Sequence, residues 1–405
     1  MPPATWLGRP DRRAFLHTLG LAGIPGLVAQ AAPLLAAAPP TDPGRVLVLV
    51  QLAGGNDGLN TVIPHADDRY FRARPRLAIP GRRVLRLTDH LGFHPEMGGL
   101  GRLYRDGGLA IVTNVGYPNP NRSHFKSMDV WETATPPDRV ARTGWIGRYL
   151  DTRPQRHGLL GLRLGDQAAL SLQGERPGSV TLAHPSILEP GTEGPLARGL
   201  DQMAVVESTA DGPLDHIQRV FRDSRALAHR LREATRTVRD TVQYPPYVLC
   251  QSLKLVARMI SVGLPTRVYF VTLGGFDTHA AQAERHAGLL QELSEALTLF
   301  RQDLRASGQL DRVLLMTFSE FGRRVAENRQ GGTDHGTSSS LFLLGGSVKP
   351  GVHGGPPDLG QLDDQGDLRF QVDFRSVYAS VLKHWLGVDP TSIVGRFAPL
   401  PLFRS

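Results

Sequence analysis

The run at residues 45–52, Arg-Val-Leu-Val-Leu-Val-Gln-Leu, constrains the fold more than any other part of the sequence. A nearly continuous series of Val and Leu is typical of a strand that is buried on both faces, and such strands occur in parallel sheets that are covered by helices. The run ends in a glycine-rich turn, Ala-Gly-Gly-Asn-Asp-Gly. This pattern favours an α/β fold.

The rest of the chain alternates strand-like and helix-like segments. Four more short apolar runs predict strands, at residues 109–115, 267–273, 312–317 and 340–344. Three segments with apolar residues at helical spacing predict helices, at residues 217–242, 280–307 and 377–386. Strands that alternate with long helices indicate a mostly parallel central sheet flanked by helices.

The domain organisation follows from length and composition. Residues 42–405 suffice for one large α/β domain or two smaller ones, and we predict a single domain. Residues 151–215 are rich in Gly and Pro with short apolar runs, so we interpret them as a loop-rich insertion with small strands.

The N-terminus has the pattern of a targeting segment. Adjacent Arg12 and Arg13 are followed by Phe15 and Leu16, and residues 19–38 carry no charge. A basic start, an apolar middle and small residues before the mature chain are typical of export signals, and the paired arginines indicate the twin-arginine route. We therefore expect residues 1–38 to engage the twin-arginine export machinery and the mature bacterial protein to be periplasmic or secreted.

The alternative for this segment is a permanent membrane anchor. Its apolar character comes mainly from Ala, and Pro25 and Pro33 interrupt it, whereas anchors are richer in Leu, Ile and Val. We therefore expect no permanent membrane span. Cleavage after Ala31 or after Ala38 would fit the preference for small residues.

Charge and cysteine content exclude some functions. The net charge is +8, and the +6 that remains after the targeting segment is spread along the chain without a basic block interleaved with aromatic residues, so nucleic acid is not an expected partner. The excess supports only a mild attraction for anionic substrates. Cys250 is the only cysteine, so there is no internal disulfide, and its apolar surroundings predict a buried thiol.

Polar residues follow the predicted strands where each one ends. Asp57 follows the first strand, Asp277 and His279 follow the strand that ends at residue 273, and Glu320 follows the strand that ends at residue 317. His335 lies in a polar loop shortly beyond. Ligands of open α/β sheets bind beyond the carboxyl ends of the strands, so these side chains are expected to converge. Oxygen and imidazole ligands in that place indicate a binuclear hydrolytic metal centre.

Each carboxylate also has a structural interpretation. Asp57 could form a turn, and Asp277 could cap the helix that begins near residue 280. Glu320 could pair with Arg323 or Arg324. His335 is harder to explain in this way, because nothing in so polar a loop gives it a packing role. Its neighbour Asp334 could bind the metal or orient the imidazole from behind.

A further polar cluster, Asn-Arg-Ser-His-Phe at residues 121–125, precedes a predicted helix at 125–132. Ser123 would lie at the N-terminus of this helix, where the helix dipole and free N–H groups stabilise an anion. Ser123 is therefore either a nucleophile or an ordinary N-cap.

Taken together, these motifs resemble a known family, the uncharacterised domain of unknown function 1501, which belongs to the alkaline phosphatase-like superfamily in the sulfatase-like clan. The twin-arginine start fits the same family. The resemblance covers nearly the whole mature chain and is carried by Gly54-Gly-Asn-Asp-Gly-Leu-Asn, Arg122-Ser-His-Phe, Gly144-Trp-Ile-Gly-Arg, Gly274-Gly-Phe-Asp-Thr-His with Gln282, Ser319-Glu-Phe-Gly-Arg and Gly332-Thr-Asp-His-Gly.

The resemblance implies a central sheet between helices, with two divalent metal ions at the strand ends. It does not distinguish zinc, manganese, calcium and magnesium. Two features depart from the superfamily: Phe321 stands where a histidine usually follows the carboxylate, and the spacing from Asp277 to His279 is short. Ser123 resembles the nucleophile, and the residues that resemble metal ligands are Asp57, Asp277, His279, Glu320 and His335.

These observations predict an exported metal-dependent hydrolase of phosphate or sulfate esters, acting on an anionic small molecule or polymer. Ser123 would attack phosphorus or sulfur, and Arg122 or Arg323 would hold the non-bridging oxygens. The alternative is an exported binding or assembly protein that keeps the fold and has lost catalysis, which the departures from the superfamily pattern would fit.

Overall fold

The computed structural model describes residues 44–153, 160–165, 167–176, 179–182, 238 and 240–404. The central element within these residues is a sheet of nine strands. In spatial order the strands are β11 (Gly351–His353), β5 (Ala110–Gly116), β10 (Ser339–Gly345), β9 (Val313–Phe318), β1 (Val46–Leu52), β8 (Val268–Leu273), β6 (Gly161–Leu164) and β7 (Ser179–Leu182), with β12 (Val372–Asp373) paired to β5.

The sheet is parallel except at one strand. β1 pairs in parallel with β8 and with β9, whereas β10 runs antiparallel to both β5 and β9. The carboxyl ends of β1, β5, β8 and β9 therefore lie at one edge of the sheet, and β10 begins at the same edge. All loops that carry the predicted site residues emerge there.

The five strands predicted from the sequence are confirmed, with each boundary within one residue of its prediction. Every residue of β1 is buried. Alternate residues contribute to two cores, because successive side chains of a strand point to opposite faces: Val48 and Val50 pack in one core, Leu47 and Leu49 in the other. Burial on both faces explains why the strand lacks polar alternation.

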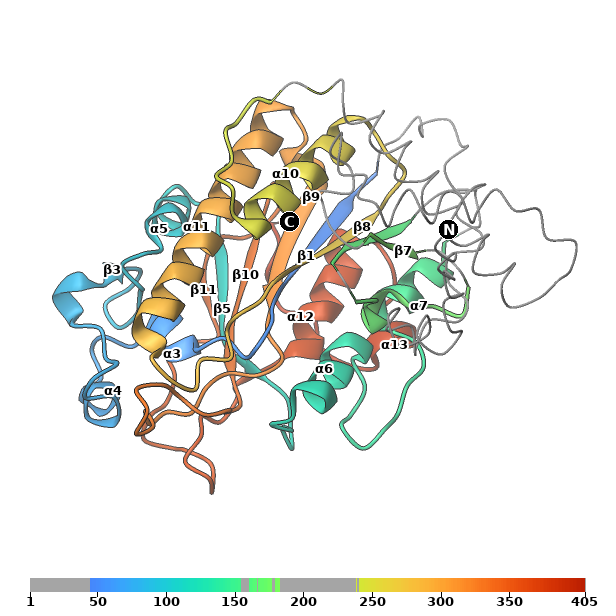
Figure 1. Cartoon of the computed structure of the whole chain (residues 1–405). Helices are drawn as coiled ribbons and strands as arrows, with labels where there is room; N and C mark the ends of the chain where they lie inside the picture. Colours follow the sequence, from blue (N-terminus) through green and yellow to red (C-terminus); the bar gives the residue numbers. More distant parts are fainter. Residues whose placement is uncertain are drawn as a thin grey trace, which may run out of the picture.

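Helices cover both faces of the sheet (Figure 1). On one face lie α5 (Gly98–Arg105), α10 (Val248–Ser261) and α11 (Gln282–Ala306), and on the other α6 (His124–Thr133), α7 (Trp145–Asp151) and α12 (Phe374–Ser380). Aromatic stacking joins α12 to its neighbours, with ring centroids 4.3 Å apart for Trp131 and Phe374 and 4.2 Å apart for Trp145 and Tyr378. The predicted α/β class is confirmed.

Three of the four predicted helices are present in the described residues. The helix expected at 280–307 is α11, and the one expected at 377–386 is α12 followed by a π-helical turn, Val381–Trp385. The helix at 125–132 is α6. The helix expected at 217–242 lies almost wholly outside the described residues. Cys250 is buried on α10, as predicted.

The predicted loop-rich insertion at 151–215 contributes β6 and β7, which extend the main sheet beyond β8. Its other residues lie mostly outside the described ranges. No helix in the described part of the chain is long and apolar enough to cross a membrane. The remaining elements are the small sheet β2 (Val62–Ile63), β4 (Gly92–Phe93) and β3 (Leu85–Arg86), the short helices α3 (Gly58–Thr61), α4 (Asp68–Ala73) and α13 (Thr391–Val394), and 3-10 turns at Gly81–Arg83, Leu170–Leu172 and Leu310–Arg312.

Candidate metal centre

Asp277 lies at the centre of a cluster of histidines at the carboxyl edge of the sheet. It follows β8, and its Oδ1 lies 3.1 Å from Nε2 of His279 and 3.1 Å from Nε2 of His335. Its Oδ2 lies 3.6 Å from Nε2 of His124, the first residue of α6. The two ring nitrogens of His279 and His335 are themselves 2.9 Å apart. Three loops therefore bring three imidazoles to one carboxylate.

The opposite nitrogen of each imidazole is held by an oxygen acceptor. A backbone carbonyl oxygen accepts but cannot donate, and an ionised carboxylate behaves in the same way, so each Nδ1 carries the proton of its ring. In the neutral ring the Nε2 atom then presents a lone pair. The Nδ1 partners are Glu320 Oε1 at 2.9 Å for His124, Asp334 Oδ1 at 3.1 Å for His279, and the Arg122 carbonyl oxygen at 2.8 Å for His335.

The lone pairs of His279, His335 and Asp277 thus meet without a proton between them. Such an arrangement is repulsive unless a cation lies among the atoms. Ligand atoms around a tetrahedral ion with bonds of about 2.0–2.1 Å lie roughly 3.3 Å apart, close to the separations seen here. The candidate ligand atoms of His124, Asp277 and His335 also lie within 4.8 Å of one another. The residues therefore fit a divalent metal ion, and oxygen acceptors behind the imidazoles are typical of metal sites.

The surroundings shift the pKa values of the candidate ligands in different directions. The hydrogen bond to Glu320 raises the pKa of His124, whereas burial lowers the pKa of His335. Burial alone would raise the pKa of Asp277, but the hydrogen bond from Arg323 and the positive charge of its guanidinium lower it to about 2. Asp277 is therefore ionised at neutral pH and supplies the negative charge at the centre of the cluster.

Arg323 forms a buried hydrogen bond with the carboxylate at the centre of the cluster. Its side chain has no exposed surface, and it donates to Asp277 Oδ1 at 2.7 Å. The sequence predicted that Arg122 or Arg323 holds substrate oxygens. The guanidinium of Arg323 is buried, and its N–H donors already have hydrogen-bond acceptors within the protein. These acceptors are the carbonyl oxygens of Gly54, Gly55, Phe276 and Thr333.

Glu320 and Asp57 take positions beside the cluster rather than in it. Glu320 Oε1 accepts from His124 Nδ1 and from the Gly54 N–H at 2.8 Å, so it orients a ligand. Asp57 is fully buried in an ion pair with Arg74 at 2.6 Å and receives a second hydrogen bond from Gln282. Its Oδ1 accepts from the N–H of Asn60, the turn chemistry considered as its structural interpretation.

Ser123 occupies the N-cap position of α6, directly before His124, and is exposed. Its side chain makes no capping hydrogen bond within the helix, and its N–H donates to Asn121 Oδ1 at 2.8 Å. Arg122 pairs with Asp367 through its Nε at 3.0 Å and keeps 24% of its side chain exposed. Both residues therefore remain at the surface beside a candidate ligand.

Phe321 explains one departure from the superfamily pattern. Its buried ring packs against His335, with ring centroids 4.6 Å apart, and against His124, with centroids 4.9 Å apart. It thus supports two imidazoles by contact and offers no ligand atom of its own. An apolar side chain therefore occupies the position at which the superfamily resemblance implies a histidine.

Sequence reasoning missed His124 as a candidate ligand. The signal was present, because an imidazole directly beyond the carboxyl end of a strand is the criterion that selected His279. Asp334 proves to orient His279, not His335. The pairing of Asp57 with Arg74 could not be read from the sequence, because nothing local marks that contact.

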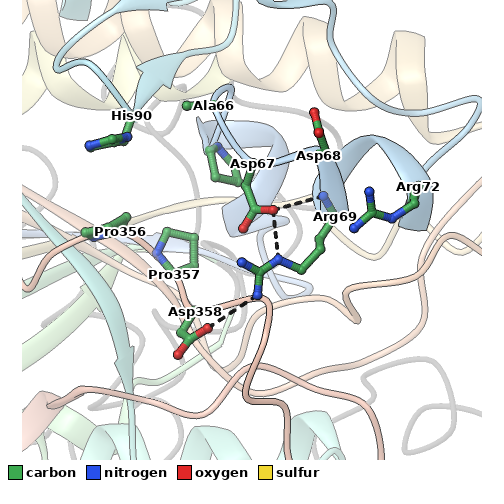
Figure 2. Close-up of a pocket in the computed structure, with 10 residues that line it drawn as sticks. Ala66, Asp67, Asp68, Arg69, Arg72, His90, Pro356, Pro357 and Asp358 are labelled. Carbon is green, nitrogen blue, oxygen red and sulfur yellow. Dashed lines mark hydrogen bonds and ion pairs between the residues drawn. The ribbon is translucent and has the colours of Figure 1, made fainter.

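A separate cleft of about 680 Å³ lies beside α4 (Figure 2). Its charges are mixed: Arg69 lies between Asp67 at 3.0 Å and Asp358 at 4.0 Å, with Arg72 and His90 in the lining. None of the clustered histidines lines it. The cleft presents no convergent ligand set, so the histidine cluster is the better candidate site.

One protein family matches most of the chain. The model of a family described as a protein of unknown function, DUF1501, matches residues 45–401. No curated protein sequence matches this one. The family resemblance seen in the motifs is confirmed.

Several solved structures are similar to this one. The C-terminal periplasmic domain of EcEptC from Escherichia coli, in complex with zinc, is 12% identical, with 92% of this chain and 91% of that chain covered and a TM-score of 0.39. PsFucS1 sulfatase from Pseudoalteromonas sp. is 13% identical, with 88% and 71% covered and a TM-score of 0.39. A protein in the alkaline phosphatase superfamily from Vibrio parahaemolyticus is 8% identical, with 85% and 72% covered and a TM-score of 0.37.

Proposed function

The chain belongs to the DUF1501 family of proteins of unknown function, and we propose that this member is an exported, metal-dependent hydrolase of phosphate or sulfate esters. The observation that carries the proposal is the convergence of unprotonated ring nitrogens on Asp277. The Nε2 atoms of His279 and His335 lie 2.9 Å apart there, and His124 is the third imidazole of the cluster. Imidazole-rich sites at a sheet edge are suited to hydrolytic metal ions.

A divalent ion in this cluster would polarise an ester oxygen and stabilise the charge that develops on a leaving oxygen. Asp277 supplies the negative ligand, since its low pKa keeps it ionised. Glu320 and Asp334 hold the rings of His124 and His279 so that their Nε2 atoms face the ion. The site is half open, with 48% of the Asp277 side chain exposed, which gives a substrate access.

Ser123 is the nucleophile in this proposal. It precedes His124 directly, it is exposed, and its hydroxyl is not used to cap α6. The oxygen would attack phosphorus or sulfur and displace the leaving alcohol, which takes up the proton that the serine loses, while N–H groups in the first turn of α6 stabilise the negative oxygens. Water would then cleave the serine ester, which releases phosphate or sulfate and restores the hydroxyl. Arg122, beside it at the surface, would contact an anionic substrate, either a small molecule or a polymer.

We propose one ion, although the superfamily pattern suggests two. The carboxylates expected to serve a second ion are engaged elsewhere: Asp57 pairs with Arg74, and Glu320 accepts from His124 and from a backbone N–H. Phe321 fills the position of a further histidine. Three imidazoles and one carboxylate favour zinc or another late transition ion over magnesium or calcium, which prefer oxygen ligands.

Export through the twin-arginine route, with a periplasmic or secreted product, is part of the proposal. It is supported by Arg12 and Arg13 and by the uncharged apolar stretch at 19–38. The route carries folded proteins, which fits a metal that is bound before export.

The metal centre is tested by elemental analysis of protein purified from the periplasm. We expect about one transition ion per chain, and almost none in the double variant His124→Ala/His335→Ala, because both rings are ligands. His90→Ala is the control, since it removes an exposed histidine outside the cluster. Wild-type protein without stoichiometric metal would exclude the proposed hydrolase.

The nucleophile is tested with an aryl phosphate and an aryl sulfate. Ser123→Ala should abolish turnover and leave metal content and melting temperature nearly unchanged, because the hydroxyl caps nothing. A variant that keeps full turnover would remove Ser123 from the mechanism.

The second candidate is a binding or assembly protein without catalysis, and Phe321 is the observation that favours it. Metal-loaded wild-type protein that turns over neither ester class, but binds phosphate or sulfate ions at the cluster, would support this alternative over the hydrolase.

A further inference from the structure

We propose that Gln282 positions the metal-binding histidines by joining the loops that carry them. Gln282 is the first residue of α11, and its side chain is buried. One loop carries Asp277 and His279, and the other carries His335. The inference rests on the proposed metal site and identifies what holds that site together.

The side-chain amide of Gln282 has hydrogen-bond partners on both loops. Its Oε1 accepts from Thr278 Oγ1 at 3.1 Å and from Thr333 Oγ1 at 2.6 Å, and its Nε2 donates to Asp57 Oδ2. A carboxylate can only accept, so the nitrogen of the amide must face Asp57 and the oxygen must face the threonines. All four side chains are buried, so water cannot replace these bonds.

The threonines are adjacent to the ligands in sequence. Thr278 lies between Asp277 and His279, and Thr333 lies two residues before His335. The Thr333 N–H also donates to the Thr278 carbonyl oxygen at 3.2 Å. The amide thus fixes the two loops at the points from which their imidazoles project.

The backbone at the start of α11 supports the same link. The Gln282 N–H donates to the Gly331 carbonyl oxygen at 2.9 Å, and the Ala281 N–H donates to that of Gln330 at 3.2 Å. Ala281 has a φ of 46°, which is unfavourable for a residue with a Cβ atom. Such a conformation persists where surrounding contacts impose it.

Asp57 anchors the far side of the amide. It pairs with Arg74, whose Nε donates to the Val325 carbonyl oxygen at 2.9 Å and whose NH2 donates to that of Arg324 at 2.7 Å. These carbonyls belong to the loop that follows β9 and leads to His335. Asp57, predicted as a ligand, thus acts on the ligands through Gln282.

This link matters because packing alone does not hold the ligands. The side chain of His279 is 41% exposed, and that of Asp277 is 48% exposed. Separation of the two loops would move the Nε2 atoms of His279 and His335 apart and weaken the site. Loss of groups that orient ligands typically weakens metal binding by about 10- to 100-fold.

The test uses Thr278→Val/Thr333→Val, which removes both hydroxyls with little change in volume. Zinc affinity is measured by competition with a chelator, and the cobalt(II)-loaded protein is compared by its visible absorption spectrum. We expect zinc affinity about 10- to 100-fold below wild type and an altered cobalt spectrum. Thr333→Ser in the wild-type background keeps the hydroxyl and should bind zinc almost as tightly as wild type.

Thr298→Val is the matched control. Thr298 lies on α11, the helix that begins at Gln282, and its hydroxyl donates to the carbonyl oxygen of Ser294 on the same helix, at 2.6 Å. The same loss of a hydroxyl there should leave zinc affinity unchanged. Thr333→Val alone, which removes one bond, replaces the double variant if that variant fails to fold, and should show a smaller loss of affinity in the same direction.

Two outcomes would overturn the inference in distinguishable ways. If the valine variants bind zinc as tightly as wild type with an unchanged cobalt spectrum, the positioning role is wrong while the metal site stands. If the wild-type protein itself binds no zinc, both the metal site and the positioning role are wrong.

Discussion

Asp57 and Arg74 form an ion pair in which neither side chain has exposed surface. Burial alone would raise the pKa of Asp57, but the charges of Arg74 and His286 and the hydrogen bonds to Asp57 lower it. In the sequence Gly-Asn-Asp-Gly, the same carboxylate could equally form a turn or bind a metal. Arg74, 17 residues away in the chain, determines the role of Asp57 by pairing with it, and no local sequence pattern predicts this pair.

Arg74→Met should destabilise the metal-free protein by about 3–5 kcal/mol, because it leaves the Asp57 carboxylate buried without its partner. Urea denaturation of metal-free protein measures the change. Arg69→Met is the control: in its pair with Asp67 the arginine is 50% exposed and the carboxylate 23% exposed, so its loss should cost about 1 kcal/mol or less. Equal effects of the two substitutions would contradict the interpretation of Asp57 as a buried structural anchor.

The sequence predicted which residues lie near the candidate site better than it predicted where their side chains point. The rule that ligands follow strand ends selected Asp277, His279 and His335, which the structure brings together. The same rule selected Asp57 and Glu320, which lie beside the cluster, and the orientation of both side chains depends on contacts between loops. The direction of a side chain in a turn is set by its tertiary partners, and these are not encoded in spacing.

Among the elements, buried strands were the most predictable. β1, β8 and β9 are apolar on both faces because helices cover both sides of the sheet, so their sequences leave a strong signal. The reversed direction of β10 leaves no such signal, since an apolar run reads the same in either direction. The helix α10 was also missed, and only its buried Cys250 was foreseen.

His286 on α11 provides a pH test of the buried network beneath the site. It is fully buried, and its Nε2 lies 3.0 Å from Asn56 Oδ1. Burial lowers its pKa to about 4, and burial also lowers the pKa of nearby His94 to about 4. The unfolded chain takes up protons near pH 6.5 that the folded chain does not accept, so stability should fall as the pH drops from about 6.5 to 4.

His286→Gln keeps a donor near Asn56 and removes the titration. For His286 alone the loss in the wild type should approach 3 kcal/mol at pH 4, at about 1.4 kcal/mol per pH unit. Urea unfolding of metal-free protein at several pH values should give a shallower decline for the variant. Parallel curves for wild type and His286→Gln would show that folding does not lower the pKa of His286.

At the scale of the whole molecule, the candidate site depends on the complete fold. Its ligands follow β5 and β8 and precede β10, and they meet only because these strand ends share one edge of the sheet. Residues 124 and 335 are far apart in the chain, so no fragment that lacks either end of this span can bind the ion. A site of this kind forms after folding and not before it.

Export of a folded chain is the prediction that follows from this arrangement. Arg12→Lys with Arg13→Lys should trap the full-length precursor in the cytoplasm, because the receptor of the twin-arginine pathway reads the arginine pair. Cell fractionation followed by immunoblotting measures the distribution, and Arg9→Lys, which changes an arginine outside the pair, should leave export unchanged. Trapped precursor should still contain the metal, since the ligands lie wholly in the folded domain. A double variant that reaches the periplasm at the normal level would contradict the targeting assignment, and trapped precursor without metal would place loading after export.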